Sequence, residues 1–205
     1  VGGNVVAAAE LRGVHPDRSG GEIDEVVIVV GYKAAMIEKH LGHEYGGRSI
    51  RYVHQWMPAG TAHALSVARP FLKGKFLLVN ADDILGPEAI AEAIKHPLSI
   101  MAAPHAEPQK FGVIAMREDG TMEAIIEKPE NPPTNLVSTG AMVLDDRLFA
   151  YDAAKHESGE YFMTHPLGLL AKEHPIKVVE QPLWIPVGYP EDIPKAEETL
   201  KELGR

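Results

Sequence analysis

Residues 25–30 read Glu-Val-Val-Ile-Val-Val, and residues 76–80 read Phe-Leu-Leu-Val-Asn. Short, continuous apolar runs of this kind are typical of strands that are buried on both faces. Further runs lie at 49–53 and 98–102. Segments with helical spacing separate the runs, at 33–41, 61–68 and 87–95. Strands that alternate with helices are joined by right-handed crossovers, so the pattern predicts a mostly parallel sheet.

The second half of the chain has a different pattern. Strand-like runs at 111–116 and 121–127 are joined by a turn that ends in Asp119-Gly120, a strong hairpin signal. Three later elements and a final helix are expected, at 136–144, 161–173, 176–180 and 190–203, whereas residues 4–23 look irregular. The predicted fold is therefore α/β: a Rossmann-like, mostly parallel sheet flanked by helices, with a small antiparallel β insertion.

Composition limits the classes of function. The chain has 205 residues, a length typical of one domain, and its 29 acidic and 20 basic side chains give a formal net charge of −9. This charge disfavours a nucleic-acid partner, and no stretch approaches the roughly 20 apolar residues of a membrane span, so neither partner is expected. A cytoplasmic location is the default. The absence of cysteine excludes disulfides, thiolate metal sites and cysteine nucleophiles.

Polar residues that directly follow the apolar runs are candidates for a site, because ligands bind at the carboxyl ends of parallel strands. Asp82 and Asp83 follow one such run and could bind Mg²⁺ together with phosphate oxygens, or could lie in a solvated turn. Gln55 carries both donors and acceptors suited to the edge of a base, and Gly60 would let the backbone approach a flat ligand. A simple turn that begins a helix is the alternative.

A third candidate is the pair Glu127-Lys128 at the end of a predicted strand. The carboxylate could hold a sugar hydroxyl and the ammonium a phosphate, although a solvated ion pair on a loop is more common. The nucleophile elbow, the H-E-x-x-H zinc motif, the dinucleotide fingerprint and the P-loop motif are all absent from the sequence. Serine hydrolases, zincins and P-loop enzymes are therefore disfavoured.

Taken together and in order, these phrases resemble the sugar-1-phosphate nucleotidyltransferases, also called nucleoside-diphosphate-sugar pyrophosphorylases. The resemblance extends over nearly the whole chain. It rests on seven phrases: 25–33 (EVVIVVGYK), 55–65 (QWMPAGTAHAL), 76–86 (FLLVNADDILG), 111–113 (FGV), 126–130 (IEKPE), 135–140 (NLVSTG) and 187–196 (VGYPEDIPKA). Each phrase alone is weak, and the seven in sequence are specific.

The resemblance implies an enzyme in nucleotide-sugar biosynthesis that joins a nucleoside triphosphate, with dTTP or UTP favoured, to a sugar-1-phosphate and releases pyrophosphate. It implies roles for nine residues. Asp82 and Lys128 would be catalytic, with Asp82 also binding Mg²⁺ as the cofactor. Gln55, Gly60 and Thr61 would bind the nucleotide. The sugar would be bound by Gly112, Glu127, Thr139 and Gly140. The sequence is also compatible with a homo-oligomer.

Two features of the family are missing from this sequence. The Gly-rich G-x-G-T-R phosphate loop and its lysine would precede Val1, so residues 1–205 are expected to be a single nucleotidyltransferase domain without the first strand and that loop. In addition, Pro186 stands where the family usually has a second metal-binding acid. Either Asp82 suffices, or Asp83 or another acid compensates, or catalysis is impaired. A non-catalytic homologue that binds nucleotide or sugar phosphate is the alternative. Transfer to a non-sugar phosphate is a third interpretation.

Overall fold

The computed structural model describes residues 6–12 and 22–204. Its strands are β1 (Val6–Arg12), β2 (Glu22–Val30), β3 (Glu44–Tyr45), β4 (Arg48–His54), β5 (Phe76–Asn80), β6 (Asp83–Leu85), β7 (Ser99–Pro104), β8 (Gly112–Met116), β9 (Met122–Glu127), β10 (Leu136–Leu144), β11 (Lys177–Glu180) and β12 (Trp184–Pro186). The α-helices are α1 (Ala34–Leu41), α2 (Thr61–Ala68), α3 (Pro87–Ala93), α4 (Thr164–Glu173) and α5 (Asp192–Glu202). Short 3₁₀ turns are η1 (Arg69–Phe71), η2 (Pro108–Lys110) and η3 (Asp146–Ala150).

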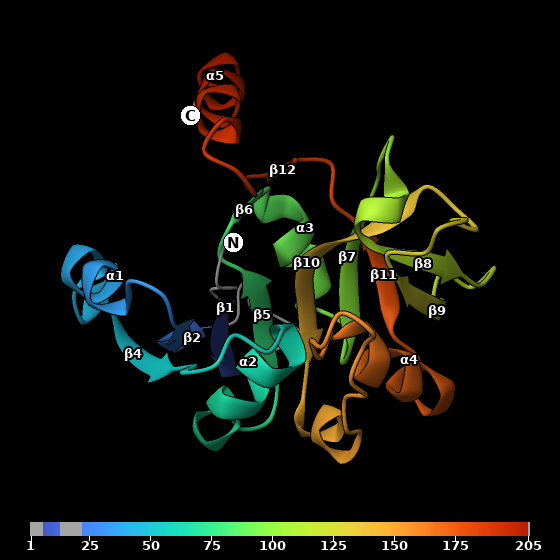
Figure 1. The fold of residues 1–205 in the computed structure, drawn as a ribbon, viewed down its shortest axis with the longest axis horizontal. Helices are drawn as coiled ribbons and strands as arrows, with labels where there is room; N and C mark the ends of the chain where they lie inside the picture. The colour runs from blue at the N-terminus through green and yellow to red at the C-terminus, as the bar shows by residue number, and fades with distance from the viewer. Residues whose placement is uncertain (1–5, 13–21, 205) are drawn as a thin grey trace.

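One twisted sheet organises the molecule, in the strand order β11-β7-β10-β5-β1-β2-β4-β3 (Figure 1). Strands β2, β4, β5, β7 and β11 run in one direction, which confirms the mostly parallel α/β fold. Strands β1 and β10 run the opposite way between them, so their neighbours in the sheet are antiparallel. Strand β1 is not predicted from the sequence, because its short apolar run lies within residues 4–23, which have no regular pattern. A small separate sheet pairs β6 with β12.

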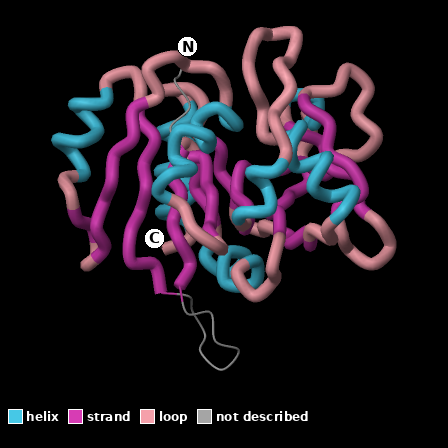
Figure 2. Tube along the Cα trace, turned by 90° about the horizontal axis from the view of Figure 1, so that it is seen from below, coloured by secondary structure: helices cyan, strands magenta, loops and turns pink. Residues whose placement is uncertain are grey.

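Helices cover both faces of the sheet (Figure 2). Strand β5 is apolar on both faces, and its alternate residues pack into two different clusters. Phe76 and Leu78 contact the core under α2 and α4, whereas Leu77 packs against α3. The cluster under α1 is smaller. The antiparallel insertion is present as the hairpin β8–β9, which also pairs with β10. Gly120 occupies the tight turn with a φ of 77°.

The ends of two helices matter for the site. Helix α3 begins with Pro87 at its first position, as predicted. Helix α4 begins at Thr164 and not at 161. Tyr161 lies outside the helix because its amide donates to the Ala59 carbonyl at 2.8 Å and its carbonyl accepts from the Ala62 amide at 2.9 Å. We call residues 160–164 the connecting segment.

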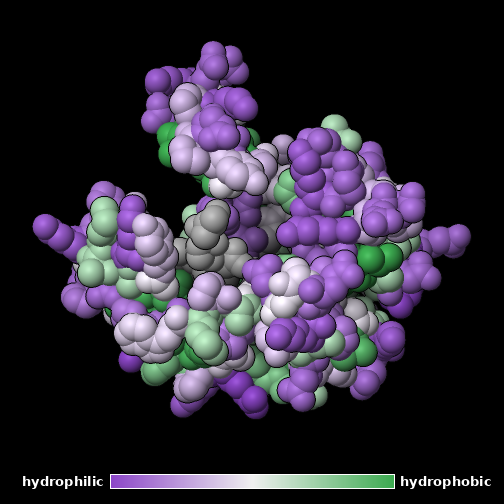
Figure 3. Space-filling model, in the orientation of Figure 1, coloured by the Kyte–Doolittle hydropathy of each residue, from purple (hydrophilic) through white to green (hydrophobic). Residues whose placement is uncertain are grey.

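Helix α5 stands out from the body of the molecule (Figure 1), and Figure 3 shows mostly hydrophilic residues on its visible face. Ala196 is its one buried residue. Within the described part of the chain, no helix has both the length and the apolar character that a membrane span requires.

Candidate active site

A cavity of about 330 Å³ lies between the β8–β9 hairpin, strands β5 and β10, and the starts of α2 and α4. We call it the hairpin cavity. It brings together residues that are far apart in sequence and that the sequence analysis had selected: Thr61, Gly112, Glu127, Lys128 and Gly140. The structure therefore places five of the nine candidates around one space.

Gly112 and Glu127 face each other because they are paired in the β8–β9 ladder. A side chain at position 112 would not fit, since a Cβ atom there would lie 2.9 Å from Cγ2 of Thr164. The Thr164 methyl packs against the bare backbone of Gly112, and both residues line the hairpin cavity. Glycine, which has no Cβ atom, permits this close approach to the backbone.

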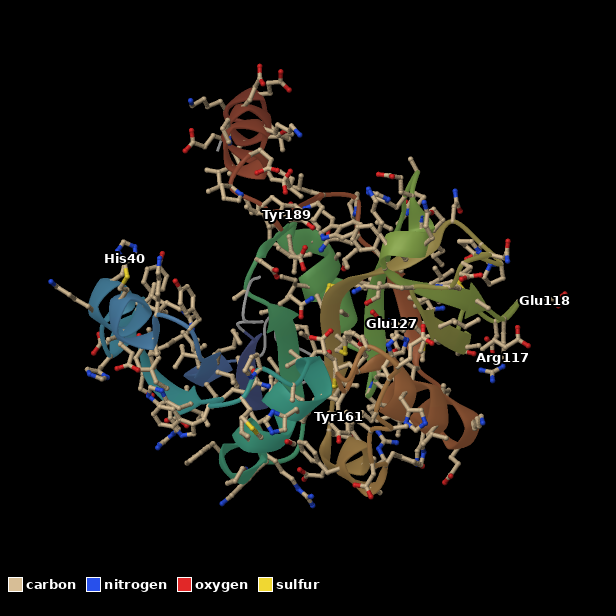
Figure 4. All side chains as sticks on the ribbon, in the orientation of Figure 1. His40, Arg117, Glu118, Glu127, Tyr161 and Tyr189 are labelled. Carbon is tan, nitrogen blue, oxygen red and sulfur yellow. The ribbon has the colours of Figure 1, made fainter. Side chains whose placement is uncertain are left out.

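Glu127, labelled in Figure 4, lines the hairpin cavity as a largely buried carboxylate whose side chain is 15% exposed. Burial raises its pKa, against the opposing effects of the Lys128 charge and of a hydrogen bond from the Thr164 hydroxyl. The Lys128 ammonium lies 3.8 Å from Oε1 of Glu127 and 5.1 Å from the centre of the Phe162 ring. A cation and a hydrogen-bond acceptor are thus available side by side.

The backbone at Lys128 is strained. Its φ is 39°, in the left-handed region that non-glycine residues rarely adopt. The Lys128 amide donates to the Phe111 carbonyl at 3.0 Å, which fixes the residue at the end of the hairpin ladder. Strain of this kind persists only where the surroundings impose it, and it is concentrated at functional sites.

Gln55 and Gly60 are joined by a hydrogen bond in the turn before α2. Gln55 is 5% exposed, and its Nε2 donates to the Gly60 carbonyl at 3.2 Å and to Nδ1 of His63 at 2.8 Å. Gly60 has a φ of 94°, and a Cβ atom there would lie 2.5 Å from the Tyr161 carbonyl oxygen. Both amide protons of Gln55 are donated to protein acceptors, so Oε1 is the side-chain atom left to bind a base. That role stays a prediction.

A smaller cavity of about 180 Å³ adjoins the first. We call it the carboxylate cavity, because Asp82 and Asp83 line it together with Thr139, Trp184 and Pro186. The two cavities share four lining residues: Asn80, Phe111, Ser138 and Gly140. A ligand with two polar ends could therefore extend from one cavity into the other.

The two aspartates differ in their surroundings. Asp82 remains exposed, although desolvation raises its pKa. Burial raises the pKa of Asp83 to about 7, in spite of the lowering effect of a 2.7 Å hydrogen bond from Nε1 of Trp184. Pro186 pairs with Asp83 in the β6–β12 ladder and adds no ligand atom from its side chain. Among the described residues, no group of three acidic, histidine or cysteine side chains could enclose a metal ion.

Thr139 and Gly140 lie in a bulge of β10. Between the pairs Ser138–Ala102 and Met142–Ile100, β10 has three residues where β7 has one. The Thr139 hydroxyl donates to the Met101 carbonyl at 3.1 Å and so satisfies a group that the bulge leaves unpaired. Gly140, with a φ of 72°, leaves room for the Asn80 amide, which a Cβ atom would overlap at 2.2 Å.

Several lining residues of the hairpin cavity are not predicted from the sequence. The omitted lining residues include Lys110 and Phe111, just before β8, and Glu160, Phe162 and Thr164 of the connecting segment. Residues 161–173 were expected to be helical, so the segment before α4 was not recognised as part of a cavity wall. The glycine at position 159 is the signal that could have indicated an irregular segment before the helix.

Comparisons with known proteins agree with this geometry. A family model described as nucleotidyl transferase matches residues 17–202. The UTP–glucose-1-phosphate uridylyltransferase AglF of Haloferax volcanii is 31% identical over 191 residues, which cover 87% of this chain and 78% of that protein. The bifunctional protein GlmU of Methanocaldococcus jannaschii is 28% identical over 181 residues, and the match covers 87% of this chain. The chain spans only 43% of that relative's length.

A solved structure has the same fold. The UDP-glucose pyrophosphorylase that was crystallised with UDP-glucose superimposes with a TM-score of 0.75, over 87% of this chain and 81% of that one. The sequence identity is 20%, so this likeness concerns the architecture alone.

Proposed function

The chain belongs to the nucleotidyl transferase family, and we propose that it transfers a nucleotidyl group from a nucleoside triphosphate, with dTTP or UTP favoured, to a sugar-1-phosphate. The products are a nucleoside diphosphate sugar and pyrophosphate. One observation carries this proposal: the hairpin cavity joins a buried carboxylate, an ammonium group and a bare glycine backbone. These groups match the hydroxyls, the phosphate and the ring of a sugar phosphate.

On the acceptor side, Glu127 accepts hydrogen bonds from sugar hydroxyls, and Lys128 binds the sugar phosphate. The proximity of Glu127 orients the ammonium, and the strained backbone limits where it can move. Gly112 gives the sugar ring access to the hairpin backbone. Thr139 and Gly140 shape the passage to the carboxylate cavity, with Thr139 acting through its hydrogen bond to Met101.

On the nucleotide side, the Gly60-Thr61 backbone and Oε1 of Gln55 meet the base. Asp82 would hold Mg²⁺ together with phosphate oxygens and water, because Mg²⁺ prefers one or two carboxylates and retains several waters. The donor set fits this mode, since Asp82 offers an exposed carboxylate at the edge of a small polar cavity. The ion would neutralise phosphate charge when bound. Asp83 is held by Trp184 and is the less available of the two carboxylates.

The reaction needs little covalent chemistry from the protein. A phosphate oxygen of the sugar-1-phosphate attacks the α-phosphorus of the triphosphate, and the bond to the bridging oxygen of the β-phosphate breaks, so pyrophosphate leaves with that electron pair. Catalysis of such a transfer depends on positioning and charge neutralisation. Lys128 and Asp82 would contribute charge, and the hairpin cavity would orient the attacking oxygen.

The proposal is tested by pyrophosphate release on the full-length protein, with UTP, dTTP, ATP and GTP each combined with several sugar-1-phosphates. We expect turnover with a pyrimidine nucleotide and at least a hundredfold loss in Lys128→Met and in Asp82→Ala, as is usual when a charge-stabilising group is removed. Lys95→Met is the matched control, because Lys95 pairs with Glu92 away from both cavities. Turnover that survives Asp82→Ala would remove the metal role of this residue.

Pro186 favours a second candidate function. Because it faces Asp83 with no ligand atom, the chain could bind nucleotide or sugar phosphate without catalysis. Calorimetry separates the two functions. Saturable binding of UDP-glucose without pyrophosphate release under any substrate combination would support the non-catalytic alternative.

A further inference from the structure

A third cavity, of about 350 Å³, lies beside α2 and is as large as the hairpin cavity. We call it the α2 cavity. It is formed by α2, by the region around η3 and by the connecting segment. Its polar and aromatic lining residues include His63, Arg69, Phe149, Tyr151, Asp152 and Tyr161. The proposed reaction uses none of them.

The α2 cavity and the hairpin cavity share a wall. Along the connecting segment, Tyr161 lines the α2 cavity, whereas Glu160, Phe162 and Thr164 line the hairpin cavity, and Met163 lines both. Tyr161 and Phe162, which are adjacent in sequence, therefore line opposite sides of this wall. The start of α2 divides in the same way, with Thr61 on one side and His63 on the other.

Backbone hydrogen bonds hold this wall together. The Tyr161 amide donates to the Ala59 carbonyl at 2.8 Å, and the Ala62 amide donates to the Tyr161 carbonyl at 2.9 Å. The Met163 amide donates to Oγ1 of Thr61 at 3.1 Å. Tyr161 lies beside α2, as Figure 4 shows. A displacement of Tyr161 would therefore also move Thr61 and the turn at Gly60.

The chemistry of the α2 cavity favours an aromatic anion. The Arg69 guanidinium lies over the Phe149 ring, 5.0 Å from its centre, and in the described part of the chain no carboxylate forms an ion pair with it. Nδ1 of His63 accepts from the Gln55 amide, so the imidazole proton is on Nε2, where it can be donated. Two donors, rings and apolar side chains of α2 and η3, with Asp152 as the one acidic side chain among the described lining residues, suit a ring whose phosphate or carboxylate binds at Arg69.

We propose that the α2 cavity is an effector site for a small aromatic acid, and that its occupation tightens the wall shared with the hairpin cavity. The Arg69 guanidinium binds the acidic group, and the aromatic rings contact the ring of the ligand. Ordering of the wall by one ligand reduces the ordering that a second ligand must impose, which gives positive coupling. This inference goes beyond the proposed function and does not depend on it.

Phenyl phosphate is the probe, titrated into the full-length protein by calorimetry. We expect saturable binding that Arg69→Met weakens about tenfold, as loss of a charged hydrogen bond does. Ala153→Leu, which fills part of the cavity, should also weaken it. Arg48→Met is the matched control on β4, and Lys128→Met reports binding in the hairpin cavity. The site is refuted if no binding occurs, if Arg69→Met behaves like Arg48→Met, or if Lys128→Met removes the binding.

Hydrogen exchange tests the coupling. Phenyl phosphate should slow exchange of the Ala62, Tyr161 and Met163 amides in the wild type by about fivefold or more, and it should have no such effect in Arg69→Met. Circular dichroism checks that Arg69→Met is folded. Binding without slower exchange of these three amides would overturn the effector role.

Discussion

Asp83 should make the protein less stable as the pH rises through neutrality. Burial raises its pKa from an ordinary value of 3.8 to about 7, so between these values the native carboxyl is protonated and the unfolded one is not. The native state then binds more protons, and the free energy of unfolding falls as pH increases. A difference of about 3 pH units at 1.36 kcal/mol per unit gives about 4 kcal/mol. Partial solvent contact reduces this, and we expect about 2–4 kcal/mol.

The substitution Asp83→Asn isolates this effect. An asparagine keeps an oxygen for the Trp184 indole and cannot ionise, so the variant should gain stability relative to the wild type between pH 4 and pH 8. The assay is urea denaturation of both proteins, with chelator present, at each pH. Asp119→Asn is the control of opposite sign, because hydrogen bonds from Thr121 lower the pKa of Asp119 and its stabilisation is lost at acid pH. Parallel stability curves for Asp83→Asn and the wild type would refute the reasoning.

Three further results are expected. Phe76→Ala should lower the free energy of unfolding by about 3–5 kcal/mol in denaturant titrations, since Phe76 is completely buried. Gly60→Ala should disrupt the connecting segment, because the new Cβ would overlap the Tyr161 carbonyl; Gly42→Ala, also at positive φ but in open space, should be milder, and thermal unfolding compares the two. Glu127→Gln should raise stability relative to the wild type once the pH exceeds the ordinary carboxyl pKa, because burial raises the pKa of Glu127, while the KM for the sugar phosphate increases. Denaturation at several pH values measures the gain in stability, and steady-state kinetics measure the increase in KM.

The main elements follow from local sequence. Apolar runs such as 25–30 and 76–80 are strands because residues buried on both faces must all be apolar, and Gly42 and Pro87 bound helices as their backbone preferences require. Helix α2 has the predicted bounds. These features depend on neighbours a few residues away, which a sequence displays directly.

The features of the structure that the sequence does not predict depend on contacts between distant parts of the chain. The positions of β1 and β10 between parallel strands depend on partners far away in the chain, so local periodicity does not reveal them. The connecting segment begins outside the helix because Tyr161 bonds to Ala59 and Ala62, about a hundred positions earlier. For the same reason, Glu160 and Phe162 were not recognised as lining residues, although phrases such as 126–130 identified Glu127 and Lys128.

The bulge in β10 indicates where the hairpin cavity can be redesigned. Its extra residues are flanked by regular pairing at Ser138 and Met142, and Thr139 closes the gap with a side-chain hydrogen bond. Length can therefore be added or removed at this one place while the ladder on either side keeps its alignment. The bulge is therefore the place at which to change the length of β10 for a bulkier sugar, provided that position 140 stays a glycine and leaves room for the Asn80 amide.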